Sequence, residues 1–255
     1  DEVYNITDFK NKSLPDKRIN GVDVQGTTAY ISTVFGVVEL DLEEYKFTNT
    51  YTTGLNTYCT YLFNRTLFCG TETGMYSCDI DKNLLDKNNW VKKNNYFTKA
   101  ICELDGMLYC YLDEFGIYSY NASNNILKDV VYNHGEKYNA MYSNGKEIIA
   151  SAKKKTTIIT SPTDVTVYKN SNSNFILKDG NHFWDCKGYN GIVKCIAKDG
   201  EIIVNSTSFT PDSPIRNYCE YMKFASDDKL LVAGGNLNYF DITFYDGTLM
   251  EYDYS

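Results

Sequence analysis

The two histidines are the first residues to consider for catalysis, because a Ser-His-Asp or Cys-His pair needs an imidazole as its base. His134 lies in a segment that predicts an exposed turn, and His182 begins a predicted strand beside Phe183 and Trp184. We therefore expect both imidazoles to be surface or packing groups rather than catalytic bases.

The 33 acidic residues include close pairs, and paired carboxylates are the catalytic groups of glycoside hydrolases. No pair has a spacing that distinguishes it, and such pairs are typical of solvated turns and strand edges. The pairs are Glu43 with Glu44, Asp79 with Asp81, and Asp227 with Asp228. The sequence predicts that the protein is not an enzyme and binds no cofactor. A hydrolase or lyase that uses carboxylates in a central channel is the alternative.

Eight cysteines, an even number, are spaced as in neighbouring strands of a hairpin, which predicts disulfides. Separations of 10, 8 and 9 residues suggest pairing within three hairpins, and the two remaining cysteines would join distant parts of the chain. The suggested pairs are Cys59 with Cys69, Cys102 with Cys110, Cys186 with Cys195, and Cys78 with Cys219. There is no Cys-x-x-Cys and there are few histidines, so no zinc or other metal site is predicted.

Five Asn-x-Ser/Thr sequons predict glycosylation, and together with the cysteines they predict a secreted, extracellular protein. They begin at Asn5, Asn11, Asn64, Asn121 and Asn205. No apolar run is long enough to cross a bilayer, so no membrane insertion is expected. The net charge of −8 argues against a nucleic-acid partner, since phosphates must be neutralised by Lys and Arg. Residues 153–155, the only basic run, are predicted to be a solvated loop or edge strand.

A repeat of roughly 40 residues indicates how the chain folds. Turn glycines precede short strand-like segments at Gly36, Gly74, Gly116 and Gly191. Weaker copies begin near Lys155 and Asn236, which makes six copies. Two short strands precede each glycine, and a fourth, weaker strand follows each glycine strand.

This pattern predicts an all-β fold with six blades of four antiparallel strands, a single disulfide-stapled β-propeller over residues 1–255. Residues 1–18 would form an N-terminal segment or a closing strand, and a helical turn is allowed only in residues 81–93. A pair of β-sandwiches is the rival architecture, but it gives no reason for the repeat.

Residues 64–71, followed by Gly74 and Cys78, read Asn-Arg-Thr-Leu-Phe-Cys-Gly-Thr and resemble the Cys-Gly-Thr…Cys element of sema domains. About 25 residues, Cys59 to Cys78, carry the resemblance. It implies a semaphorin-like propeller, a bond between Cys59 and Cys69, and a plexin-like receptor. The Asn-, Lys- and Tyr-rich composition is similar to that of poxvirus proteins. The chain departs from the family in having six predicted blades rather than seven.

We expect the protein to bind a host cell-surface receptor or a secreted cytokine and to act as a viral immune modulator or decoy. A basic cytokine or chemokine would be favoured by the charge of −8. A surface adhesin stays open as a further class. The predicted partner-binding residues are aromatic side chains on loops, Tyr45, Phe115, Tyr189 and Tyr245.

Overall fold

The computed structural model describes 16, 18–51, 54–132, 137–170, 173–186 and 192–205, and the backbone of 221–226, 229–236 and 239–246. Residues 1–15, and with them most of the predicted N-terminal or closing segment, lie outside this range. Among the described residues the structure is almost entirely β-strand. The helical turn allowed in residues 81–93 is confirmed as a short 3₁₀ helix, η1 (Lys87–Asn89).

Antiparallel meanders of four strands make up most of the chain, as predicted. The first is β1 (Ile19–Gln25), β2 (Thr28–Thr33), β3 (Gly36–Asp41) and β4 (Lys46–Tyr51). The second is β5 (Thr57–Phe63), β6 (Thr66–Thr71), β7 (Gly74–Asp79) and β8 (Val91–Lys92). The third is β9 (Thr98–Leu104), β10 (Met107–Leu112), β11 (Gly116–Asn121) and β12 (Ile126–Tyr132).

The next two meanders share one eight-stranded sheet. The fourth is β13 (Tyr138–Ser143), β14 (Ile148–Ala152), β15 (Lys155–Ser161) and β16 (Asp164–Lys169). The fifth is β17 (Phe175–Asp179), β18 (His182–Cys186), β19 (Ile192–Lys198) and β20 (Glu201–Val204). A single parallel bridge between Lys169 and Glu201 joins them. A last sheet has three strands, β21 (Tyr221–Ser226), β22 (Lys229–Asn236) and β23 (Tyr239–Asp246).

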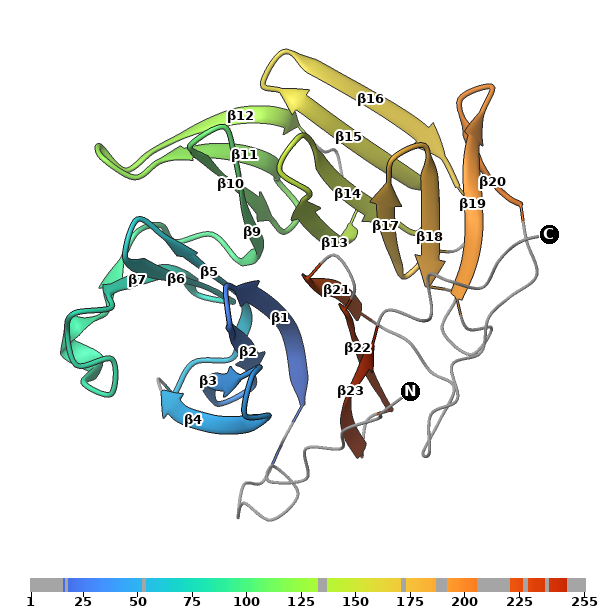
Figure 1. Cartoon of the computed structure of the whole chain (residues 1–255). Helices are drawn as coiled ribbons and strands as arrows, with labels where there is room; N and C mark the ends of the chain where they lie inside the picture. The colour runs from blue at the N-terminus through green and yellow to red at the C-terminus, as the bar shows by residue number, and fades with distance from the viewer. Residues whose placement is uncertain are drawn as a thin grey trace.

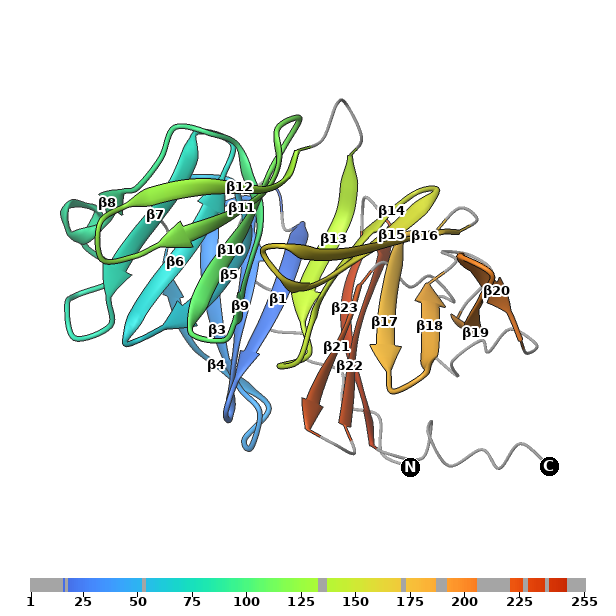
Figure 2. The same ribbon diagram turned by 90° about the horizontal axis from the view of Figure 1, so that it is seen from above.

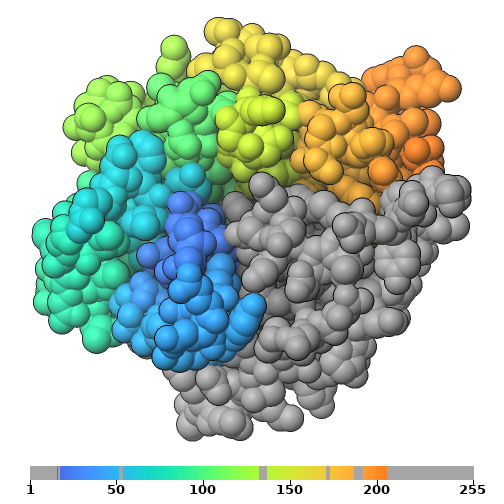
Figure 3. Space-filling model, in the orientation of Figure 1, coloured from blue at the N-terminus to red at the C-terminus, as the bar shows by residue number. Residues whose placement is uncertain are grey.

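The sheets are arranged radially, with the first strand of each nearest the axis (Figure 1). These innermost strands contact one another in order: β1 with β5, β5 with β9, β9 with β13, β13 with β17, β17 with β21, and β21 with β1. Figure 2 shows the same sheets from above, and Figure 3 shows the five four-stranded blades following one another around one face. The fold is a β-propeller. A sixth blade with four strands stays a prediction.

The core consists of apolar layers between neighbouring blades, because the two faces of one sheet point to different neighbours. Between the first and second blades, Val37 packs with Leu67 and Cys69. Between the second and third, Met75 packs with Leu108. In β14, the second strand of the fourth blade, all five residues are therefore buried.

The predicted disulfides within hairpins are wrong, because the partners point to opposite faces of their sheets. Tyr109 lies opposite Cys102, so Cys110, one residue further, points to the other face. Likewise, Thr60 rather than Cys59 lies opposite Cys69. The third hairpin shows the same offset, since Cys195 lies opposite Phe183 and not on the face of Cys186. No disulfide joins any two of the seven described cysteines, and Cys219 lies outside the described residues.

Buried tyrosines are expected to make the protein unstable in alkali. Burial, with smaller contributions from nearby carboxylates or thiols, raises the pKa of Tyr30 and of Tyr120 to about 12. In the unfolded chain these phenols lose their protons near pH 10, so between about pH 10 and 12 the unfolded state binds fewer protons than the folded state. Stability is then fully present below pH 10 and falls as the pH rises through that range. The free energy of unfolding measured by urea at stepped pH checks this, and a flat profile up to pH 12 would contradict it.

Candidate functional site

The innermost strands of the first four blades each contain a β-bulge at the same place, close to where the strand begins. In each case one residue has no Cα partner on the second strand: Asn20, Tyr58, Lys99 and Asn139. Bulges redirect side chains and are frequent beside functional sites. All four residues line one cavity of about 60 Å³ on the propeller axis. We call the end of the propeller that carries these four residues the bulge face.

Two of the bulge residues join neighbouring blades. Asn20 Nδ2 donates hydrogen bonds to the Thr57 carbonyl oxygen (2.7 Å) and to Asn56 Oδ1 (2.8 Å) of the second blade. Asn139 Nδ2 donates to the Ser173 carbonyl oxygen (2.9 Å) at the start of the fifth. The two asparagines therefore have a structural role: they hold neighbouring blades together at the edge of the cavity on the axis.

Tyr58 extends these polar contacts toward the third blade. Its hydroxyl donates to Glu72 Oε1 (2.5 Å) and accepts from Asn56 Nδ2 (3.0 Å), and its ring meets Phe97 edge-on at 4.8 Å between centroids. Burial, and then the hydrogen bond to Glu72, raises the pKa of Tyr58 to about 12. The phenol is therefore neutral at physiological pH.

Lys99 is held by a carboxylate rather than left open to the channel. Its Nζ lies 3.2 Å from Asp113 Oδ1 and 5.0 Å from the centroid of the Phe97 ring. Asp113 is buried and also accepts from the Tyr111 hydroxyl (3.0 Å). In turn, the Tyr111 hydroxyl accepts from the backbone N–H of Tyr138 (3.0 Å), which ties the fourth blade to the third.

In each of the first four blades, the turn between the second and third strands also lies on the bulge face. This is because the second strand runs antiparallel to the first and ends where the first begins. Thr33 Oγ1 donates to the Gly36 carbonyl oxygen (2.9 Å), and Thr71 Oγ1 donates to that of Gly74 (2.7 Å). Both glycines have a φ of about 140° (141° and 142°), which favours glycine. In the first two blades the repeated glycine found in the sequence is therefore part of a Thr-x-x-Gly turn, and in the third blade Asp113 stands where the threonine would be.

An exposed aromatic pair lies on the bulge face at the third blade. Tyr96 and Phe115 are each 44% exposed, and their rings meet edge-on with centroids 5.1 Å apart. Lys137 lies close to the turn that carries Phe115, with its Nζ 3.5 Å from Glu114 Oε1 and 4.0 Å from Asp113 Oδ2. This arrangement, aromatic side chains bordered by charges, is typical of a protein-binding surface.

Two of the predicted partner-binding residues, Phe115 and Tyr45, lie at opposite ends of the propeller. Phe115 is exposed, as expected. Tyr45 is half-buried against the core of the first blade, in the turn at the other end of the propeller. Tyr245 lies within β23 opposite Leu230, not on a loop, and Tyr189 lies outside the described residues. Tyr96 was missed because it follows a weak strand and belongs to no repeat.

Three sequon asparagines are described, and all three are exposed: Asn64, Asn121 and Asn205. Asn64 lies in the β5–β6 turn and Asn121 ends β11, so both are at the end opposite the bulge face. Asn5 and Asn11 lie outside the described residues, as does His134. His182 is an exposed residue at the start of β18. No helix in the described part of the chain is long and apolar enough to span a membrane.

Comparison with known proteins supports the propeller. Residues 1–91 match a family model described as "TSS9, PorZ, N-terminal beta-propeller domain". PorZ, a surface component of the type-IX secretion system of Porphyromonas gingivalis, is 19% identical over 93% of this chain and 33% of its own, with a TM-score of 0.65. The extracellular domain of the hybrid two-component system BT4673 of B. thetaiotaomicron is 16% identical over 93% and 34%, with a TM-score of 0.63. A chain of a nidogen/laminin complex is 12% identical over 76% and 81%, with a TM-score of 0.59.

The chain thus spans about a third of the length of PorZ and of the BT4673 domain. A search of curated proteins found no match. The family model that matches is not the sema domain. At these identities the likeness shows the fold alone.

Proposed function

We propose that this propeller is a binding protein and that it holds a protein partner on its bulge face. The exposed aromatic pair, Tyr96 and Phe115, carries the proposal. Aromatic side chains contribute large contact area at a low cost in conformational entropy, and they dominate the energetics of many interfaces. The charged residues Glu114 and Lys137 supply the polar rim that surrounds such anchors.

Binding is preferred to catalysis because the carboxylates that line or border the channel are already engaged. Asp113 is ion-paired with Lys99 and hydrogen-bonded to Tyr111. Asp23, which lines the channel cavity, accepts a hydrogen bond from Gln25 (3.0 Å). A general acid or base needs a proton to exchange with a substrate, and these groups are committed to the protein. The described residues therefore give the hydrolase or lyase alternative no specific observation in its favour.

We propose an extracellular or surface location. The surface location of PorZ and the extracellular domain of BT4673 are the support from related folds. Exposed sequons at Asn64 and Asn121 would carry sugars at the far end of the propeller, which would leave the bulge face open. The plexin-like receptor and the basic cytokine or chemokine stay predictions for the partner, as does the role in viral immune modulation.

The test is an affinity pull-down from host cell surfaces and culture medium with three baits: the wild type, Y96S/F115S, and I126S. Ile126 is 57% exposed on the same blade but at the opposite end, so I126S removes a comparable exposed apolar group elsewhere. We expect one protein that binds saturably to the wild type and to I126S. The double variant should bind it about 30- to 1,000-fold more weakly, as expected for two anchors of roughly 1–2 kcal/mol each.

Retention of that protein by Y96S/F115S at wild-type affinity would contradict the proposal. Loss with I126S alone would move the binding site to the opposite face.

A further inference from the structure

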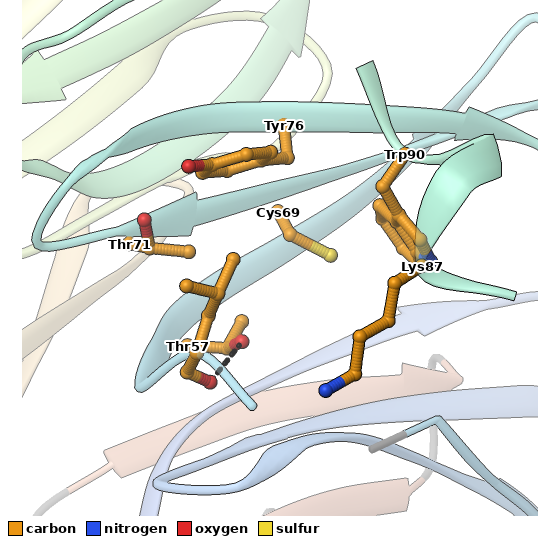
Figure 4. Close-up of a pocket in the computed structure, with 7 residues that line it drawn as sticks. Thr57, Cys69, Thr71, Tyr76, Lys87 and Trp90 are labelled. Atoms are coloured by element: carbon orange, nitrogen blue, oxygen red, sulfur yellow. Dashed lines mark hydrogen bonds between the residues drawn. The ribbon is translucent and has the colours of Figure 1, made fainter. Parts of the chain in front are cut away.

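A second cavity, of about 190 Å³, lies in the second blade under the insertion that connects β7 to β8 (Figure 4). We call it the blade-2 pocket. An apolar cavity of roughly 150 Å³ is large enough to bind benzene, so this pocket has room for one aromatic ring. It is lined by Leu55, Thr57, Cys69, Thr71, Tyr76, Lys87 and Trp90.

The insertion is a built structure that fixes two of the lining residues. Asp86 caps η1 by accepting a hydrogen bond from the Asn88 backbone N–H (2.9 Å). Trp90 Nε1 donates to the Leu84 carbonyl oxygen (3.0 Å). The only polar atom of the indole is therefore used within the insertion, and the Trp90 ring presents apolar surface to the pocket.

The other walls are also apolar in effect, because their polar groups are occupied. Thr71 Oγ1 donates to the Gly74 carbonyl oxygen, and Thr57 Oγ1 donates to that of Leu55 (3.3 Å). Burial raises the pKa of the Cys69 thiol well above its ordinary value, so the sulfur is neutral and behaves as a small apolar group. Its Sγ points into the space between Tyr76 and Trp90 (Figure 4).

Lys87 is the one cation in this lining, and its side chain extends along the pocket toward Thr57 (Figure 4). None of the ion pairs among the described residues includes it. Lys92 adds a second positive charge nearby, with its Nζ 5.8 Å from the centroid of the Tyr76 ring. The pocket therefore combines an apolar interior with positive charge.

We propose that the blade-2 pocket binds an aromatic carboxylate, with the ring between Tyr76 and Trp90 and the carboxylate on Lys87. Both a free arylalkanoic acid and the C-terminal aromatic residue of a peptide have this chemistry. The site is distinct from the aromatic pair on the bulge face, and its occupation does not depend on the partner proposed there.

Trp90 makes the pocket measurable, because Trp90 and Trp184 are the only tryptophans. In W184F, Trp90 is the sole indole, and its fluorescence is followed as 3-phenylpropionate is added. We expect a saturable change with a Kd of about 1 mM or lower, as usual for so small a ligand. N-acetyl-Gly-Phe and its C-terminal amide form the second arm, which reports whether a peptide terminus also enters. No saturation by either acid, or equal binding of the acid and the amide, would overturn the proposal.

The role of Lys87 is tested by K87Q, with K82Q as the matched control. Lys82 is an exposed lysine of the same insertion that does not line the pocket. In the W184F background, K87Q should weaken binding of 3-phenylpropionate about fivefold, and K82Q should leave it unchanged. Equal weakening by both variants would show a net-charge effect and would overturn the assignment of the carboxylate to Lys87.

Discussion

Replacing Gly70 with alanine is expected to lower the free energy of unfolding by about 3 kcal/mol or more, at the upper end of the range for overpacking. A Cβ at this position would lie 2.5 Å from Cys59 Sγ and 2.5 Å from the Thr98 carbonyl oxygen. The Cys59 thiol could rotate away, but the Thr98 carbonyl oxygen is part of the backbone of β9 and cannot. Relief therefore requires the second and third blades to move apart. Urea unfolding with a common m-value measures the effect.

Gly106→Ala is the matched control. Gly106 has a φ of 76° in the β9–β10 turn, and a methyl group at this position would meet no atom within 4 Å. Only the left-handed backbone opposes the substitution, so a loss of about 1 kcal/mol is expected. If G70A cost no more than G106A, the close approach of the blades would not be what requires glycine at position 70.

The second large effect concerns the thiols. Burial raises the pKa of Cys59, Cys69 and Cys110, and the thiolate is the reactive form. Cys110 is fully buried in the apolar layer between the second and third blades, so a reagent reaches it only after the layer opens, whereas Cys59 lines the cavity on the axis and Cys69 lines the blade-2 pocket. We expect Ellman's reagent to react with Cys110 at least about a thousandfold more slowly in the folded protein than in urea, since opening a core layer costs several kcal/mol.

Counting thiols without a reductant separates this expectation from a disulfide-stapled fold. The Cys110→Ser variant assigns the slow signal, and K82Q serves as a variant with unchanged thiols. Absence of these three thiols from the count, even in urea, would show that they are bridged in the protein and would contradict the structure.

The sequence predicted the meanders because turn glycines and alternating apolar residues are local features. Asp105-Gly106 predicts a two-residue turn, and the structure has it. The length of this turn also shows which cysteines of the hairpin can lie on the same face of the sheet. With two residues in the turn, side chains on one face are separated by odd numbers of residues, and Cys102 and Cys110 are eight apart. Attention to this parity would have excluded that bridge.

The bulges could not be predicted, because no residue type or turn motif in the sequence marks where the register of the hairpin shifts. Asn20, Tyr58, Lys99 and Asn139 share a position but are of three residue types, so they do not stand out in the repeat. Gly70 was noticed only as part of Cys-Gly-Thr. Its requirement comes from Thr98, 28 residues away, whose approach is a property of how blades pack.

The repeated bulge also bears on how such a chain can diversify. Because the bulge is part of the backbone of each of the first four meanders, duplicating such a meander duplicates a channel-facing position together with its geometry. Asparagine, tyrosine and lysine already occupy it within this one chain. The backbone thus supplies a fixed set of positions that line the cavity on the axis. A point substitution at one of these positions can change the chemistry of the cavity without altering the fold.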